Sequence, residues 1–242
     1  PQPNWRDDLR DFTKLGKPRL FFAVSAGAMD SMVNHYTANL RLRSNDAYTP
    51  GGKAGFRPDR AIDTYTKILK RLYPHTPVVV GGIEASLRRL THYDYWSDKL
   101  QRSVLATSGA DLLIYGMGDK PIREVAKSLR NGFNMKLLRG LRQVGFLADK
   151  EYVERLYSGK TIVLNTFEEC VQDKYKFGEN FCHIEQLSNM MECNTTLVEQ
   201  VDDRYVVITP PHETLTTEEL DHSFDLPYER APHPRYNGEG DI

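Results

Sequence analysis

The chain has 242 residues, with 32 basic and 33 acidic side chains and a formal net charge of -1. This length suits one large domain or one domain with an appendage, and the balanced charge does not indicate nucleic acid or an anionic membrane as a partner. No apolar run approaches the ~20 residues of a membrane-spanning helix, and three cysteines without C-x-x-C spacing are typical of reduced thiols in a cytoplasmic protein.

Through about residue 135, short apolar runs alternate with helical patterns. Three nearly continuous apolar runs predict buried strands: 20–26, 78–80 and 112–115. The other segments predict helices: one capped by Asp59 and closed by Pro74, a mostly helical or turn-like stretch over 85–105, and one capped by Asp119 that ends at 131–132. Strand and helix in this order indicate βαβ units, and therefore a parallel sheet with helices on both faces.

Beyond residue 131 the pattern changes. Apolar residues over 137–144 suggest a helix, and short strands are expected at 161–164 and 205–209. Two capping boxes, Thr166 with Glu169 and Thr216 with Glu219, predict a longer helix that carries the three cysteines and a short helix that ends near residue 227. We therefore expect an α/β domain over 1–135, a smaller αβ subdomain over 136–226 and a Pro-rich linker over 227–242.

The stretch PVVVGGIEASLRRLTHYDYWSD, residues 77–98, runs from a strand through two glycines into charged and aromatic side chains. In an open parallel sheet, ligands lie outside the carboxyl ends of the strands, where backbone N–H groups are free. On a helix from Ala85, the two arginines would share a face with the histidine. The candidate binding residues here are Gly81, Gly82, Glu84, Arg88, Arg89 and His92. The alternative is a solvated face with inward-packed rings, and it is favoured for any single residue.

The side chains in this stretch have complementary chemistry. Arg88 and Arg89 would pair with a carboxylate or a phosphate, because a guanidinium binds such groups through two hydrogen bonds. Glu84 and His92 would move protons or orient a substrate.

Three further candidates lie outside this stretch. Asp30 and His35 follow the strand over 20–26, where a capped turn is the alternative interpretation. Lys53 lies in a Gly-rich loop that either cradles an anion or is mobile. The G-x-G at 116–118 is weak evidence for a dinucleotide, because Pro121 stands where the third glycine belongs.

Four stretches of the chain resemble one known family. They are GAMDSMVNHYTANLRLRSNDAYTPGGKAGFRPDRA, PVVVGGIEASLRRLTHYDYWSDK, DLLIYGMG and TTEELDHSFDLPYERAPHPRY. Together they closely resemble the amino-terminal region of the YgiQ-type uncharacterised radical SAM proteins. The strand-Gly-Gly motif and DLLIYGMGD are also similar to motifs of cobalamin-binding-like domains. This resemblance implies a Rossmann-like, flavodoxin-type three-layer domain.

The family resemblance also implies what this chain lacks. Members carry C-x-x-x-C-x-x-C, whose three thiolates bind a 4Fe–4S cluster that holds S-adenosylmethionine. Cys170, Cys182 and Cys193 do not have that spacing, so no cofactor is expected in this chain, and cluster and S-adenosylmethionine are expected in the full-length protein. The cobalamin-ligating pattern D-x-H-x-x-G is absent from these 242 residues, so the resemblance does not establish cobalamin.

Two roles follow from the resemblance. In the first, the chain is the amino-terminal domain of a radical SAM enzyme of unknown substrate, and it binds substrate or cofactor at the mouth of the carboxyl-terminal barrel of the same polypeptide. In the second, the same residues form an intramolecular docking surface and bind no small molecule. The first role predicts that Glu84, Arg88 and His92 converge on one concave pocket, and the second that they lie across an apolar patch. A self-sufficient nucleotide-binding protein is a third, less favoured alternative.

Overall fold

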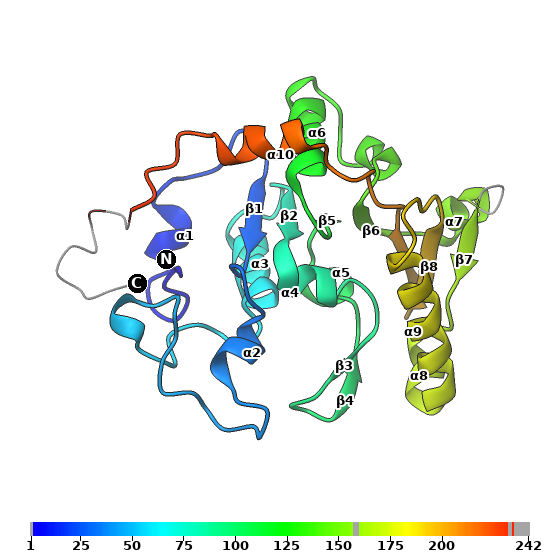
Figure 1. The fold of residues 1–242 in the computed structure, drawn as a ribbon, viewed down its shortest axis with the longest axis horizontal. Helices are drawn as coiled ribbons and strands as arrows, with labels where there is room; N and C mark the ends of the chain where they lie inside the picture. The colour runs from blue at the N-terminus through cyan, green and yellow to red at the C-terminus, as the bar shows by residue number, and fades with distance from the viewer. Residues whose placement is uncertain (1, 157–159, 232–233, 235–242) are drawn as a thin grey trace.

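The computed structural model describes residues 2–156, 160–231 and 234. A seven-stranded sheet runs from near the middle of the molecule to its right side in Figure 1. Its strands lie side by side in this order: β1 (Phe22–Ser25), β2 (Val78–Gly81), β5 (Leu112–Ile114), β6 (Val144–Ala148), β9 (Arg204–Ile208), β8 (Thr196–Val201) and β7 (Thr161–Val163). The hairpin of β3 (His92–Asp94) and β4 (Lys99–Gln101) projects away from this sheet.

The amino-terminal strands are parallel, as expected. In the register of the sheet, Ser25 pairs with Gly81 and Val80 pairs with Leu113, so β1, β2 and β5 end at the same edge. Parallel neighbours of this kind require a crossover connection, and in a βαβ unit a helix returns the chain to the start of the next strand.

Helices cover both faces of the parallel strands. Neighbouring side chains on a strand point to opposite faces, so Val80 packs with Ile62 and Leu105 whereas Val79 packs with Val125. The first face carries α3 (Ala61–Leu72), α4 (Gly82–Leu87) and α5 (Val104–Ser108), and the second carries α6 (Asp119–Arg130). The predicted three-layer α/β fold is confirmed.

The carboxyl-terminal half extends the same sheet. Strand β6 is antiparallel to β5 and to β9, β8 is antiparallel to β9, and β7 is parallel to β8. The remaining elements are α1 (Arg10–Thr13), α2 (Ser31–His35), η1 (Pro50–Gly52), η2 (Leu137–Gly140), α7 (Lys150–Leu156), α8 (Phe167–Gln172), α9 (Lys174–Ser188) and α10 (Thr217–Phe224). The expected boundary near residue 135 falls between elements of one sheet, and that division stays a prediction.

Several expected boundaries are confirmed and others are wrong. Both capping boxes are formed, at Thr166 and at Thr216. Helix α3 lies where it was expected, but Arg60 holds its N-cap position and Asp59 instead contacts His35. Gly118, and not Asp119, is the N-cap of α6.

The stretch over 85–105, expected to be mostly helical or turn-like, is helical only at its two ends and turn-like at 88–91 and 95–98, and the expectation missed two short strands. Helix α4 ends at Leu87, and the hairpin of β3 and β4 follows it before α5 begins. His92 is therefore a strand residue and shares no helix face with Arg88 and Arg89. A tight turn at 95–98 joins the two short strands.

The helix expected over 137–144 is also wrong. Residues 137–140 form the single turn η2, and Val144 begins strand β6, because short apolar runs fit a buried strand as well as a helix. The helix expected to hold the three cysteines is broken at Asp173, so Cys170 lies in α8 and Cys182 in α9. Cys193 lies outside both helices, just before β8. Within the described ranges, no helix is long and apolar enough to cross a lipid bilayer.

Candidate functional site

The two predicted glycines lie where β2 ends. Gly82 has φ +83°, and a Cβ at this position would lie 2.6 Å from Oγ of Ser25 on the neighbouring strand. A Cβ at Gly81 would lie 3.3 Å from the carbonyl oxygen of Ile114. The tight approach of β1, β2 and β5 at their carboxyl ends therefore requires glycine at position 82.

Glu84 joins two helices and is only 1 % exposed. Its Oε2 accepts hydrogen bonds from the backbone N–H of Ser31 at 3.1 Å and from the Ser31 hydroxyl at 2.5 Å. Its Oε1 accepts from the backbone N–H of Ile62 at 2.9 Å. One buried carboxylate thus satisfies free N–H groups in the first turns of α2 and α3.

Arg88 and Asp30 form a mostly buried ion pair. Asp30 is also the N-cap of α2, since its Oδ1 accepts from the backbone N–H of Met32 at 3.0 Å and of Val33 at 3.3 Å. These contacts connect the end of α4 to the segment after β1, so both predicted residues hold the carboxyl edge together.

His92 is half-buried and its Nδ1 donates to the carbonyl of Leu90 at 3.1 Å. Burial lowers the pKa of His92 to about 4, so the imidazole is neutral at physiological pH. Glu84, Arg88 and His92 do not converge on either cavity described below. A ligand role for these three residues stays a prediction.

His35 lies between two carboxylates. Its Nδ1 is 2.8 Å from Oδ1 of Asp59, and its Nε2 is 3.4 Å from Oδ2 of the buried Asp46. Lys53 is exposed, and its carbonyl accepts from the Thr49 hydroxyl at 2.5 Å in the Gly-rich loop. The imidazole of His35 is therefore held in place by two carboxylates of the fold, whereas the side chain of Lys53 lies at the surface.

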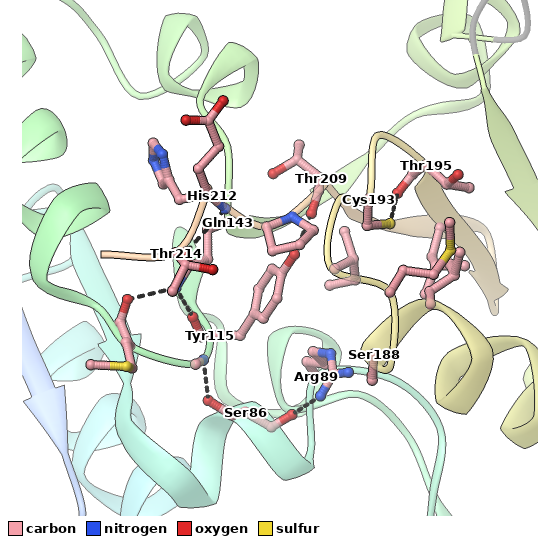
Figure 2. A pocket seen from close by; sticks show the side chains of 18 of the residues that line it. Ser86, Arg89, Tyr115, Gln143, Ser188, Cys193, Thr195, Thr209, His212 and Thr214 are labelled. Atoms are coloured by element: carbon pink, nitrogen blue, oxygen red, sulfur yellow. Dashed lines mark hydrogen bonds between the residues drawn. The ribbon is translucent and has the colours of Figure 1, made fainter. Parts of the chain in front are cut away.

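A cavity of about 480 Å³ lies where β5 and β9 end and where β6 and β8 begin (Figure 2). It is walled by the end of α4, the carboxyl end of α9 and the loop over 209–215. Of the predicted residues, Arg89 lines it. The residues that carry its polar chemistry are Ser86, Arg89, Tyr115, Gln143, Thr209 and His212.

Gln143 fixes the floor of this cavity. Its backbone has φ +61° and its side chain is buried. Nε2 donates to the carbonyls of Tyr115 and Met117, both at 2.6 Å, and Oε1 accepts from the backbone N–H of His212 at 3.1 Å. The Tyr115 hydroxyl donates to the carbonyl of Thr209 at 2.6 Å. Three strand-end segments are thus held in one arrangement, which pre-organises the cavity.

Arg89 presents a buried guanidinium to the cavity. Its Nη1 donates to the carbonyl of Ser86 at 2.6 Å, and its guanidinium carbon lies 5.3 Å from the centre of the Tyr115 ring. Its Nε is buried without a hydrogen-bond partner. Burial lowers the pKa of Arg89, because the charged form is poorly solvated there.

The thiols do not match the cluster that the family resemblance implies. Cys170 and Cys193 are buried on different segments, and Cys182 is exposed on α9. Among the described residues, no three His, Cys, Asp or Glu side chains lie close enough to share a metal ion. The cysteines of this chain therefore do not fit a 4Fe–4S cluster.

A second cavity, of about 360 Å³, lies at the carboxyl ends of β1, β2 and β5. Gly81 and Gly82 line it together with both glycines of the G-x-G and with Asp119 at the start of α6. Of the charged candidates that the sequence offers, Arg89 lines the first cavity and none lines the second, so a binding role for the candidates at this edge of the sheet stays a prediction. Gln143 and His212 were missed, because both are isolated polar residues. Gln143 precedes β6, a strand that was also missed, and His212 follows β9, a strand that was expected.

Comparisons with known proteins agree on one family. The family described as Radical SAM N-terminal matches residues 1–242. A UPF0313 protein of Porphyromonas gingivalis is 56% identical over 246 residues, which is 99% of this chain and 37% of that protein. UPF0313 proteins of Bacteroides thetaiotaomicron and Clostridium botulinum strain Okra are 53% and 43% identical, over 40% and 36% of their lengths and 99% and 100% of this chain. No solved structure gives a significant match. The chain therefore spans little more than a third of these relatives.

Proposed function

Because this chain belongs to the family of radical SAM N-terminal domains, the YgiQ-type UPF0313 proteins, we propose that it serves a radical SAM iron–sulfur enzyme by helping to bind substrate or cofactor. The carboxyl-terminal barrel of the same polypeptide is the proposed partner and would hold the cluster and S-adenosylmethionine. The observation that carries this proposal is the cavity of about 480 Å³ beside Arg89. Small-molecule sites are commonly concave, mostly apolar and furnished with a few fixed polar groups.

The chemistry of the cavity fits binding better than proton transfer. Burial raises the pKa of the Tyr115 phenol, and its hydroxyl already donates to a carbonyl, so it stays protonated. Gln143 is neutral and committed to three backbone contacts. Arg89 therefore supplies a positive charge in a rigid wall, which orients a ligand and leaves the reacting groups to the rest of the enzyme.

The test is substrate-stimulated cleavage of S-adenosylmethionine by the full-length protein, reconstituted with iron and sulfide under anaerobic conditions. A cell-metabolite extract should stimulate cleavage by wild type. The variant Ser188→Trp, which fills the cavity from α9, should lose that stimulation, and the exposed control Ser44→Trp should keep it. Stimulation of correctly folded Ser188→Trp at the wild-type level, or no cleavage by wild type with its cluster intact, would rule the proposal out.

Exposed apolar side chains on α4 and α2 favour the docking role, on a different surface from the one that the sequence suggested. Helix α4 buries Glu84 and exposes Ile83 and Leu87, which are 48% and 62% exposed. Val33 on α2 and Met29 before it are 49% and 43% exposed. Such apolar side chains at the carboxyl edge suit contact with the part of the polypeptide beyond this chain.

A cross-linking experiment tests this second candidate. A photoreactive residue in place of Leu87 in the full-length protein should cross-link to the carboxyl-terminal part. The control position is Leu15, which is 90% exposed near the amino terminus. Equal cross-linking from the two positions, or none from position 87, would count against docking.

A further inference from the structure

We propose that the cavity beside Arg89 takes a molecule with an anionic head group, a carboxylate or a phosphate, and an apolar tail. This inference rests on the proposed function only in treating the cavity as a binding site, and it adds the chemical class of the ligand. Four features of the cavity carry it: the charge of Arg89, the pairing of the neighbouring charges, the apolar wall and the size.

Arg89 carries a charge for which the described part of the chain provides no direct anionic partner. No salt bridge involves it in that part, Glu185 on α9 attracts it only beyond salt-bridge distance, and its guanidinium makes one hydrogen bond, to the neutral carbonyl of Ser86. Its Nε is buried and unpartnered. A guanidinium taken out of water without an anionic partner is costly, and a carboxylate or phosphate satisfies its N–H groups in pairs.

The neighbouring basic side chains already have acidic partners. Lys120 lies 2.8 Å from a carboxylate oxygen of Glu219 on α10, and His212 Nε2 lies 3.2 Å from Glu124 on α6. Glu213, a carboxylate among the described lining residues, is exposed on the loop over 209–215. Arg89 is therefore the group at which an anionic head would be held.

The opposite wall is apolar and adaptable. Ile184 and Leu187 are three positions apart on α9 and share one face, and Met190 and Met191 follow on the connection to β8. These methionines are 52% and 92% exposed, so the outer part of this wall is open to solvent. Methionine is flexible and polarisable, so this wall can adjust to an alkyl or aryl tail.

The dimensions agree with a small amphipathic ligand. A volume of about 480 Å³ lies within the usual range of sites for small molecules. Tyr115 lies under the Arg89 guanidinium and separates it from Thr209, so the head-group end of the cavity has a flat aromatic side (Figure 2). A head group bound there would lie between the end of α4 and the carboxyl end of β5.

The experiment is calorimetric titration of the full-length protein with four eight-carbon probes: octanoate, octyl phosphate, octylamine and 1-octanol. Octanoate or octyl phosphate should bind saturably, and the amine and the alcohol should give no saturable binding. The stronger of the two anions identifies the head group. Arg89→Gln should weaken anion binding at least tenfold, as expected for a lost charge-assisted pair, and Arg89→Lys should weaken it less. The control Arg71→Gln, exposed on α3, should bind like wild type.

Three outcomes would overturn the inference. They are flat titrations with both anions, binding of 1-octanol as strong as that of the anions, and wild-type affinity in Arg89→Gln. Should Arg89→Gln fail to fold, Ser188→Trp gives the same decision, because filling the cavity must abolish anion binding. Anion binding by wild type that Ser188→Trp abolishes, together with normal substrate stimulation of Ser188→Trp, would reject the proposed function and leave this inference standing. Loss of stimulation in Ser188→Trp, with no binding of either anion to wild type, would reject this inference and leave the proposed function standing.

Discussion

Glu199 on β8 accepts a hydrogen bond of 2.9 Å from the backbone N–H of Thr91, which lies 108 positions earlier in the chain. The carboxylate is 1 % exposed, and burial raises its pKa to about 7, against the opposing effect of Thr91. This contact ties the segment before β3 to the carboxyl-terminal half of the sheet. An ionisable group therefore lies at the junction of the two halves.

The first prediction concerns the pH dependence of stability. The Glu199 carboxyl has a pKa of about 7 in the folded chain and 4.5 as its ordinary value, so the folded state holds its proton more tightly. The contribution of this carboxyl to the free energy of unfolding is therefore greatest below pH 4.5, and it falls by roughly 3 kcal/mol as the pH rises to 7. Glu199→Gln should lack that fall in urea denaturation from pH 4.5 to 8. Parallel pH profiles for the two proteins would contradict it.

The second prediction concerns the turn at Gly82. Gly82→Ala must place a Cβ 2.6 Å from Oγ of Ser25 at φ +83°, so it combines a clash with backbone strain. Gly132→Ala is the matched control, because its φ is +85° and no atom lies within 4 Å of the added carbon. We expect about 1 kcal/mol of destabilisation in the control and about 1–3 kcal/mol more at position 82. Equal losses in thermal or urea unfolding would show that the close approach to Ser25 does not exist.

The third prediction concerns Glu84. Glu84→Gln keeps the shape but replaces an accepting oxygen with an N–H₂ group that faces the donors on Ser31 or Ile62. The chain should lose about 3 kcal/mol or more of stability, because buried donors are left without acceptors. The exposed Glu168→Gln on α8 should be nearly neutral in the same denaturation assay. A neutral Glu84→Gln with impaired turnover would instead support the proton-transfer role predicted from the sequence.

The fourth prediction concerns the thiols. Cys182 is exposed, whereas Cys170 and Cys193 are 2% and 4% exposed, and burial raises the pKa of Cys170 to about 11. Iodoacetamide should therefore modify one thiol quickly in the native chain and three after unfolding. Mass spectrometry of Cys182→Ser should show no fast modification. Rapid labelling of Cys193 would mean that the cavity wall opens in solution.

How far the sequence predicts this structure depends on whether the signal is local. The apolar run at 78–80 and the helix start at the Thr166 capping box are local patterns, and both were predicted correctly. Strand β8 was missed because Glu199 places a carboxylate where an apolar side chain is expected in a buried strand. Its hydrogen bond to Thr91 is a tertiary contact that no local pattern contains.

The same distinction between local patterns and tertiary contacts applies to the candidate site. Gly82 was predicted because glycine after a strand has a local conformational reason, and the φ of +83° agrees with it. Glu84 and Arg88 were singled out correctly as unusual residues, but their partners Ser31 and Asp30 lie more than 50 positions away and turn both inward. The cavity at Arg89 depends on strands from both halves, so the sequence alone indicated one of its walls.

The most direct test of the account is an experimental structure of the full-length protein with octyl phosphate bound. We predict that the phosphate lies on the Arg89 guanidinium, that the alkyl chain lies along Ile184 and Leu187, and that the cavity opens toward the domain that holds the cluster. A ligand bound elsewhere, or a cavity that faces solvent on the side away from that domain, would contradict the account.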